Sequence, residues 1–235
     1  MRDQSRPAAT RLKLQILDAP QRVLWAELGG APPQFTLYGG TALALQLGHR
    51  RSIDFDFFSA APFDARELLD TVPYLAGASV TQLAAGTMTA NVNRGGDVKL
   101  SFFTPVRALA HIGQAVESRR PRVRIASKID IAATKLAVLA MRPAAKDYLD
   151  IHALITKGRI GLADQLAAVP FVFDDPQYNP FLPLKALAYF GDGDLPSLPE
   201  NVKDDLIRSV AEVEIADVRR RMASARDNPD YWRRS

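Results

Sequence analysis

The chain contains no cysteine, only three histidines and no long apolar run. The absence of cysteine excludes disulfides, iron–sulfur clusters, zinc ribbons and cysteine nucleophiles. The histidines, His49, His111 and His152, lie too far apart in the chain to show the spacing of a metal site. No apolar stretch approaches the roughly 18 residues that a transmembrane helix needs, and the first seven residues lack the apolar segment of a signal peptide. These absences predict a cytoplasmic protein with no membrane partner.

The net charge is small but unevenly distributed. The 235 residues carry a formal charge of +4, and the apolar fraction of 47% is that of an ordinary globular protein. Five cations and no acid lie in 119–128, and four arginines lie in 219–226. Such clusters permit a polyanionic partner, although a solvated face explains them as well.

The apolar pattern and the turn residues divide the chain into two parts. In the first part we expect helices at 19–28, 41–47 and 64–72, and strands at 35–38, 53–58, 79–83, 87–92 and 97–103. From residue 127 onward the pattern predicts helices at 127–141, 143–156, 161–168, 180–190 and 200–225. An apolar stripe in the longest helix, from Ile207 to Met222, predicts that it packs on the helices before it. We therefore predict an α+β protein with an α/β core at 1–120 and a helical domain at 121–235.

Two carboxylates alternate with apolar residues in the strand predicted at 53–58. Because side chains alternate across a strand, Asp54 and Asp56 share one face, about 7 Å apart along the chain. Hard divalent ions such as Mg²⁺ or Mn²⁺ take oxygen ligands, and two of them clamp the oxygens of a phosphoryl transfer. The simpler explanation of an isolated Asp-x-Asp is a solvated acidic face.

A glycine pair lies just upstream, between the strand predicted at 35–38 and the following helix. Gly39, Gly40 and Thr41 would present backbone N–H groups and a hydroxyl to an anion such as a triphosphate. A tight turn explains the glycines equally well. In the strand predicted at 97–103, Lys99 shares a face with Asp97 and Ser101, and it would meet phosphate if this strand lies beside 53–58.

The helical part adds a lysine on an otherwise apolar helix. Lys135 needs an anion if it is buried, and either a nucleotide phosphate or an ion pair with Asp147 or Asp150 would satisfy it. Asp130, three residues after Ser127, fits the acidic member of a capping box. Lys146 and Asp150 are four residues apart and fit a surface pair.

Three segments together carry a resemblance to a known family. The run Gly39–Phe58, read as GGTALALQLGHRRSIDFDFF, closely resembles the first motif of the AbiEii/AbiGii toxin family of nucleotidyltransferases. Asp130–Lys135 is similar to that family's D-x-x-x-x-K motif, and Arg142–Asp150 to its R-x-x-x-[RK]-D-x-x-D motif. The resemblance covers roughly residues 20–157.

The resemblance implies a DNA polymerase β-like nucleotidyltransferase core, a mixed sheet with helices, followed by a helical domain. It further implies Mg²⁺-dependent transfer of a nucleoside monophosphate from an NTP, with pyrophosphate leaving. By position, Gly40 and Thr41 would hold the triphosphate, Asp54 and Asp56 the metals, and Lys135 the nucleotide phosphates. The resemblance also implies that Asp147 is a catalytic or site-organising acid. Gly39 and Lys99 would join the groups that bind the triphosphate. Residues with a supporting role at this site would be Asp130, Arg142, Lys146 and Asp150.

The sequence departs from many polymerase β-like enzymes at one position. Ser101 stands where those enzymes carry a third carboxylate that helps to deprotonate the attacking hydroxyl. Either Asp147 or a water on the metal would have to replace that carboxylate, or the rate would be low.

Three functions remain open on this basis. The first is a toxin of a toxin–antitoxin or abortive-infection system that modifies an RNA end, such as a tRNA acceptor stem, and is paired with a cognate antitoxin. The second is a nucleotidyltransferase that acts on a small molecule, as the enzymes that adenylylate antibiotics do. The third is a catalytically degenerate protein that binds a nucleotide without turnover.

Overall fold

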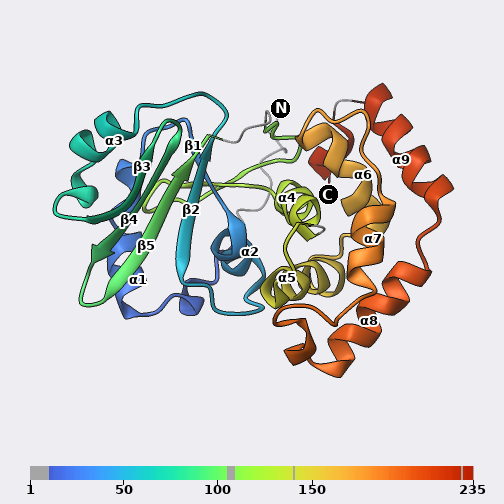
Figure 1. The fold of residues 1–235 in the computed structure, drawn as a ribbon. Coiled ribbons are helices and arrows are strands. Elements are labelled where there is room, and N and C mark those ends of the chain that lie inside the picture. The colour runs from blue at the N-terminus through green and yellow to red at the C-terminus, as the bar shows by residue number, and fades with distance from the viewer. Residues whose placement is uncertain (1–10, 105–108, 140, 229, 235) are drawn as a thin grey trace, which may run out of the picture.

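The computed structural model describes residues 11–104, 109–139, 141–228 and 230–234, and it shows a sheet on one side and a group of helices on the other (Figure 1). The strands are β1 (Phe35–Tyr38), β2 (Asp54–Ser59), β3 (Ser79–Ala84), β4 (Thr87–Asn93), β5 (Asp97–Phe103), β6 (Val116–Glu117) and β7 (Arg124–Ile125). The longer helices are α1 (Ala19–Trp25), α2 (Gly39–Leu47), α3 (Ala65–Thr71), α4 (Lys128–Leu139), α5 (Ala145–Thr156), α6 (Leu162–Val172), α7 (Phe181–Leu187), α8 (Glu200–Ala211) and α9 (Ile215–Asp227).

The described strands form one mixed sheet in the order β3-β4-β5-β2-β1-β7-β6. β2 runs antiparallel to β1 and parallel to β5, and β7 runs parallel to β1. The expected neighbourhood of the two motif strands is confirmed, because Asp54 pairs with Lys99 and Asp56 with Ser101 across β2 and β5. The α+β class with a mixed sheet is therefore confirmed.

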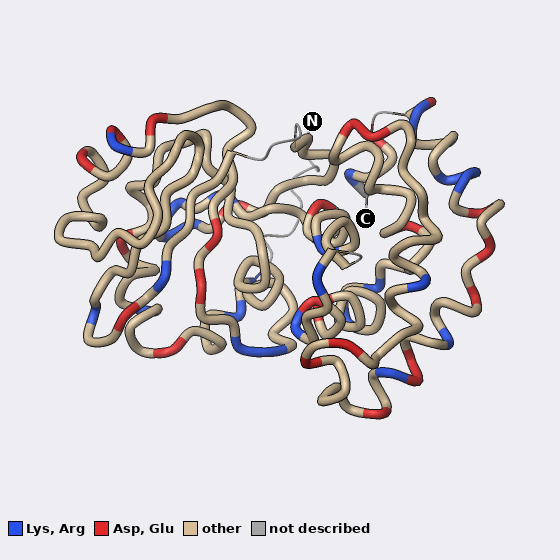
Figure 2. The backbone as a smooth tube through the Cα atoms, in the orientation of Figure 1, with Lys and Arg blue, Asp and Glu red and all other residues tan. Residues whose placement is uncertain are grey.

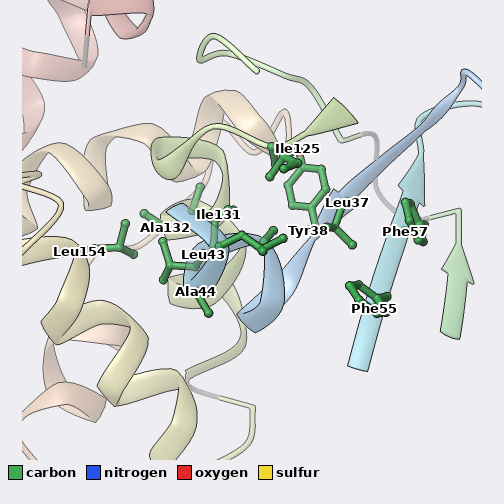
Figure 3. Close-up of a cluster of buried hydrophobic side chains, with 14 of the residues drawn as sticks. Leu37, Tyr38, Leu43, Ala44, Phe55, Phe57, Ile125, Ile131, Ala132 and Leu154 are labelled. Carbon is green, nitrogen blue, oxygen red and sulfur yellow. The ribbon is translucent and has the colours of Figure 1, made fainter. Parts of the chain in front are cut away.

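A continuous apolar core joins the sheet to the helices. α2 lies between β1 and the pair α4 and α5, and its Leu43 and Ala44 face Ile131 of α4 and Leu154 of α5 (Figure 3). These four side chains have no exposed surface. Because α2 directly follows the glycine pair, this packing fixes the position of the glycine turn at the end of β1.

Several helices begin where polar side chains cap them. Asp18 accepts a hydrogen bond from the backbone of Gln21, whose side chain accepts one from the backbone of Asp18, so a capping box starts α1. Ser127 and Asp130 confirm half of the expected box before α4: the Ser127 hydroxyl accepts from the Asp130 backbone N–H at 3.1 Å, but it donates to the Asp130 carboxylate at 2.7 Å in place of the backbone N–H of Ser127. The α4 start is therefore fixed by its own sequence.

The prediction of one long helix at 200–225 was wrong. The chain leaves the helix after Ala211 and starts α9 at Ile215, with Glu214 in an extended conformation. The reason is tertiary: α8 packs on α5 and α7, whereas α9 packs on α6. The predicted packing on earlier helices is confirmed for both helices, but the single apolar stripe is wrong, since Ile207 is 47% exposed.

Two short strands were missed. β6 and β7 have two residues each, which is too short for an alternating pattern, and β7 places Arg124 of the basic stretch in the sheet beside β1.

The division of the chain near residue 120 stays a prediction. Residue 140 of the predicted helix 127–141 and the first seven residues, which carry the cytoplasmic expectation, lie outside the described residues. Among the helices of the described ranges, none is both long and apolar enough to cross a membrane.

Candidate active site

A cavity of about 320 Å³ opens where the sheet meets the helical part. It is bounded by the end of β1, by the faces of β2 and β5 that carry Asp54 and Lys99, by the loop before β2, and by residues of α4 and α5. Its lining residues are Tyr38, Gly39, Gly40, Arg50, Ser52, Asp54, Asp56, Phe58, Lys99, Ser101, Phe103, Thr134, Lys135, Val138, Arg142 and Lys146. Most of the predicted site residues are thus brought together in one place.

Asp54 and Asp56 face this cavity from β2, as their spacing predicts. The residues between and after them, Phe55 and Phe57, are buried on the opposite face of the strand. Burial raises the pKa of Asp56, and the negative charge of Asp54 raises it further, against the opposing effect of Lys99. Two acids held together in this way favour a cation between them.

The glycine turn approaches the acids more closely than any other residue type allows. Gly39 has a φ of +72°, and a Cβ at this position would lie 2.7 Å from an Asp56 carboxylate oxygen. A Cβ at Gly40 would lie 2.3 Å from Nη2 of Arg50 and 2.9 Å from the Ser52 hydroxyl. The two glycines therefore leave the backbone at the start of α2 open to the cavity.

Thr41 has a different place from the one expected. Its side chain is fully buried and does not line the cavity, and its hydroxyl donates a 2.5 Å hydrogen bond to the carbonyl of Asp54. The Thr41 side chain thus ties α2 to β2 and holds the glycine turn beside the carboxylates, while its backbone N–H stays at the start of the helix.

A buried charge network connects the cavity to α5. Asp150 accepts hydrogen bonds from His49 and from Arg50, and Nζ of Lys135 lies 2.7 Å from its Oδ2. The carboxyl group is fully buried. Burial raises its pKa, but the hydrogen bonds from His49 and Arg50 and the charge of Lys135 outweigh burial and hold the pKa of Asp150 well below its usual range.

Asp147, one turn earlier in α5 than Asp150, holds the same lysine. Lys135 donates to Oδ1 of Asp147 at 2.6 Å, and Nη2 of Arg142 lies 3.2 Å from Oδ2. Asp147 is fully buried and does not line the cavity, whereas Lys135 and Arg142 do. Both acids that the sequence offered as partners of Lys135 therefore pair with it, and Lys135 still borders the cavity.

Two further cations border the cavity without a carboxylate partner. Among the described residues, neither Lys99 nor Lys146 makes a salt bridge, and both are exposed. The surface pair suggested for Lys146 and Asp150 does not form, because both oxygens of Asp150 are taken by His49, Arg50 and Lys135. Lys99 and Lys146 are thus available to an anion.

Asp130 lies outside the cavity. Its Oδ2 accepts from the Ser127 hydroxyl at the start of α4, and its Oδ1 accepts from the backbone N–H groups of Ile112 and Gly113, so Asp130 also fixes the loop before β6. Burial raises its pKa against these hydrogen bonds. In this structure Asp130 supports the fold around the helix that carries Lys135.

The arginine clusters do not form one basic face. Lys and Arg are spread over both parts of the molecule (Figure 2). In α9, Arg220 and Arg221 pair with Asp217, and Arg221 also contacts Asp164 of α6. The arginines of 119–124 are exposed. The α9 cluster is therefore partly neutralised.

Sequence reasoning missed Arg50 and the aromatic residues of the cavity. Arg50 stands inside the quoted motif, but its partner Asp150 is 100 residues away. Phe58 and Phe103 received no role from the sequence, although by alternation they share the strand faces of Asp56 and Ser101, and both half-buried side chains line the cavity. The register of β2 against β5 is what reveals them as a pair.

The donor set of the cavity fits a hard divalent ion. Asp54 and Asp56 supply carboxylate oxygens, and Mg²⁺ is commonly bound by one or two carboxylates together with substrate phosphates. Within the described ranges, no group of three or more His, Asp or Glu residues is placed to hold a metal. The fit therefore rests on two carboxylates whose mutual repulsion a cation would relieve.

Comparison with known proteins decides the family. The model of the nucleotidyl transferase AbiEii toxin family, described as a type IV toxin–antitoxin system, matches residues 22–233. The chain belongs to the AbiEii family. This confirms the resemblance and extends it beyond residue 157, and it identifies this AbiEii family member as a nucleotidyltransferase.

The individual proteins that this chain resembles share less than a third of its residues. An uncharacterized protein of Aquifex aeolicus (strain VF5) is 28% identical over 206 residues, which cover 87% of this chain and 93% of that protein. Among solved structures, MenT4, the nucleotidyltransferase toxin Rv2826c from Mycobacterium tuberculosis H37Rv, matches with a TM-score of 0.59 at 15% identity, over 89% of this chain and 90% of that one. At 15% identity, this structural similarity is evidence for the fold of our AbiEii family member and for nothing beyond the fold.

Proposed function

We propose that this AbiEii family member transfers a nucleoside monophosphate from an NTP to the end of an RNA, such as a tRNA acceptor stem, in a reaction that needs Mg²⁺ or Mn²⁺. We further propose that it acts in the cytoplasm as a toxin, restrained by a cognate antitoxin. The family assignment supports the toxin role and the transfer chemistry. The acceptor and the metal are the parts that this proposal adds.

One observation carries the proposal. The cavity places Asp54 and Asp56 beside the open backbone of the glycine turn, with five cationic side chains on the same lining: Arg50, Lys99, Lys135, Arg142 and Lys146. A nucleoside triphosphate carries several negative charges that need both backbone N–H groups and cations. A pocket with this lining suits a triphosphate with its metal ions and is poorly suited to an uncharged ligand.

The chain's own groups supply binding and orientation. The backbone N–H groups of Gly39 and Gly40 at the start of α2 would hold phosphate oxygens, and Arg50 and Lys135 would hold the leaving pyrophosphate. Asp54 and Asp56 would hold the divalent ions, which when bound stabilise the charge on the transferred phosphoryl group and the leaving oxygens. Asp147 and Asp150 would act as positioning residues, because they fix Lys135 and Arg50 without lining the cavity.

An RNA acceptor is tested by the salt dependence of turnover. Pyrophosphate release is measured with total cellular RNA as acceptor between about 50 and 200 mM salt, and a polyanionic acceptor predicts a steep loss of rate over this range. A small acceptor predicts a shallow dependence. Release that needs no RNA would favour a small-molecule acceptor, and nucleotide binding without release under any acceptor would identify a degenerate binder.

A further inference from the structure

β2 and β5 present three rows of side chains to the cavity. Because the strands are parallel and in register, Asp54 stands beside Lys99, Asp56 beside Ser101, and Phe58 beside Phe103. Successive rows on one face of a strand are about 7 Å apart. The face that carries the carboxylates therefore ends, one row further on, in a pair of aromatic rings.

Phe58 packs partly against the hydrophobic core, but the core covers neither Phe58 nor Phe103 completely. Phe57 and Phe102, the corresponding pair on the other face of the same strands, are buried and stacked with ring centroids 5.1 Å apart. Phe58 and Phe103 lie 5.3 Å apart, tilted by 38°, and both are only half-buried. The sheet thus carries one phenylalanine pair, Phe57 and Phe102, on its core side, and a second pair on the side that borders the polar cavity.

Phe58 is held in place by Tyr38, which also lines the cavity. Tyr38 packs edge-on against Phe58 with centroids 5.3 Å apart. The Tyr38 hydroxyl is in turn hydrogen-bonded to Nδ1 of His111 at 2.8 Å. These contacts restrict the ring of Phe58, so this part of the cavity lining is a preformed apolar surface.

Some of the groups proposed to bind phosphate, Gly40, Arg50 and Lys99, lie toward the opposite end of the rows. Arg50 and Ser52 precede Asp54 in the chain and lie against Gly40, and Lys99 shares the first row with Asp54. A pyrophosphate held there leaves the transferred phosphorus near Asp56. In phosphoryl transfer the attacking and leaving oxygens are roughly in line, so the acceptor hydroxyl must approach from the side of Phe58 and Phe103.

From this geometry we propose that Phe58 and Phe103 form a stacking platform for the terminal base of the acceptor strand. The proposal rests on the RNA acceptor of the proposed function. Every nucleobase has an aromatic face, so such a platform holds the end of a single strand with little dependence on which base it carries. The two rings bind and orient the acceptor and take no part in proton transfer.

The test compares two RNA acceptors and two variants of Phe103. One acceptor is an acceptor-stem RNA with a normal terminal nucleotide, and the other carries an abasic terminal nucleotide. Phe103→Leu keeps an apolar side chain but removes the ring, and Phe103→Tyr keeps the ring. Loss of one stacking contact predicts a rise of about tenfold in KM for the normal RNA in Phe103→Leu, with no comparable rise in KM for the NTP.

The abasic acceptor supplies the independent readout. Wild type and Phe103→Tyr should prefer the normal RNA to the abasic RNA by about tenfold, and Phe103→Leu should lose this preference. Equal thermal midpoints of the two variants exclude a folding defect as the cause. A rise in KM for the NTP alone, or an unchanged preference in Phe103→Leu, would overturn the platform and leave the transferase standing. If wild type labels no RNA at all, the proposed function fails and the platform with it.

Discussion

Arg50 donates to both carboxylate oxygens of Asp150, from Nε to Oδ1 at 2.7 Å and from Nη2 to Oδ2 at 2.8 Å. Arg50 lies in the loop between α2 and β2, and Asp150 lies in α5, so the pair links the sheet part to the helical part. A Cβ at Gly40 would strike the same guanidinium. The pair therefore sets the position of a cation directly over the glycine turn.

Breaking this pair should cost both stability and substrate binding. Asp150→Asn leaves Arg50 without its buried countercharge and Lys135 with Asp147 alone, so we expect a loss of about 3 kcal/mol, or about 6–12 °C in Tm. Arg50→Lys keeps the charge but loses the two-point contact, so KM for the NTP should rise with a smaller drop in Tm. Thermal denaturation and initial rates measure both effects, and an Asp150→Asn protein with the wild-type Tm would contradict the network.

Gly39 and Gly77 provide a matched pair for the glycine turn. Their φ values are +72° and +74°, but a Cβ at Gly39 would lie 2.7 Å from Asp56, whereas a Cβ at Gly77 would meet nothing within 4 Å. Alanine at either position should cost about 1–2 kcal/mol of stability from backbone strain. We expect only Gly39→Ala to lose most of its transferase activity as well. Similar activity in the two variants would show that the close approach to Asp56 is not needed.

Asp56 should destabilise the fold at neutral pH. Its pKa is raised in the folded protein, so the folded state binds a proton more tightly than the unfolded chain, and stability falls as the pH rises through the interval between the two pKa values. Asp56→Asn removes this penalty of burial and of repulsion by Asp54, so its Tm at pH 7.5 without metal should exceed that of wild type, by about 2–4 °C for each kcal/mol of penalty relieved. The difference should narrow as the pH falls toward about 4.

The matched control for that measurement is Asp70→Asn, an exposed carboxylate at the end of α3 and away from the cavity. Its Tm should equal that of wild type. A lower Tm for Asp56→Asn than for wild type at pH 7.5 would refute the interpretation of Asp56 as a carboxylate that is destabilised by burial and by Asp54.

Lys146 and Lys157 lie at opposite ends of α5, and only Lys146 lines the cavity. Because a hydrogen bond to a charged group contributes about 1.5–3 kcal/mol, Lys146→Gln should lower kcat/KM by about tenfold or more. Lys157→Gln, the same chemical change at an exposed position, should leave it unchanged. Steady-state kinetics on both variants makes the comparison, and equal kinetic parameters would remove Lys146 from the phosphate-binding lining.

The sequence predicted those features of the site that depend on residues close together in the chain. The alternation in β2 predicted the shared face of Asp54 and Asp56, and the capping residues before α4 predicted its start. What the sequence left open depends on contacts between distant segments. The pairing of Arg50 with Asp150, the hydroxyl of Thr41 on the backbone of Asp54, and the break after α8 follow from how helices pack on the sheet and on one another.

The central claim is that Asp54 and Asp56 support transfer of a nucleotide to RNA. The most direct measurement incubates the protein with Mg²⁺, total cellular RNA and each α-³²P-labelled NTP in turn, beside Asp54→Asn/Asp56→Asn and the control Asp70→Asn. We predict label in RNA with wild type and Asp70→Asn and none with the double variant. Label that persists in the double variant, or a wild type that binds nucleotide but labels no RNA with any NTP, would contradict the claim.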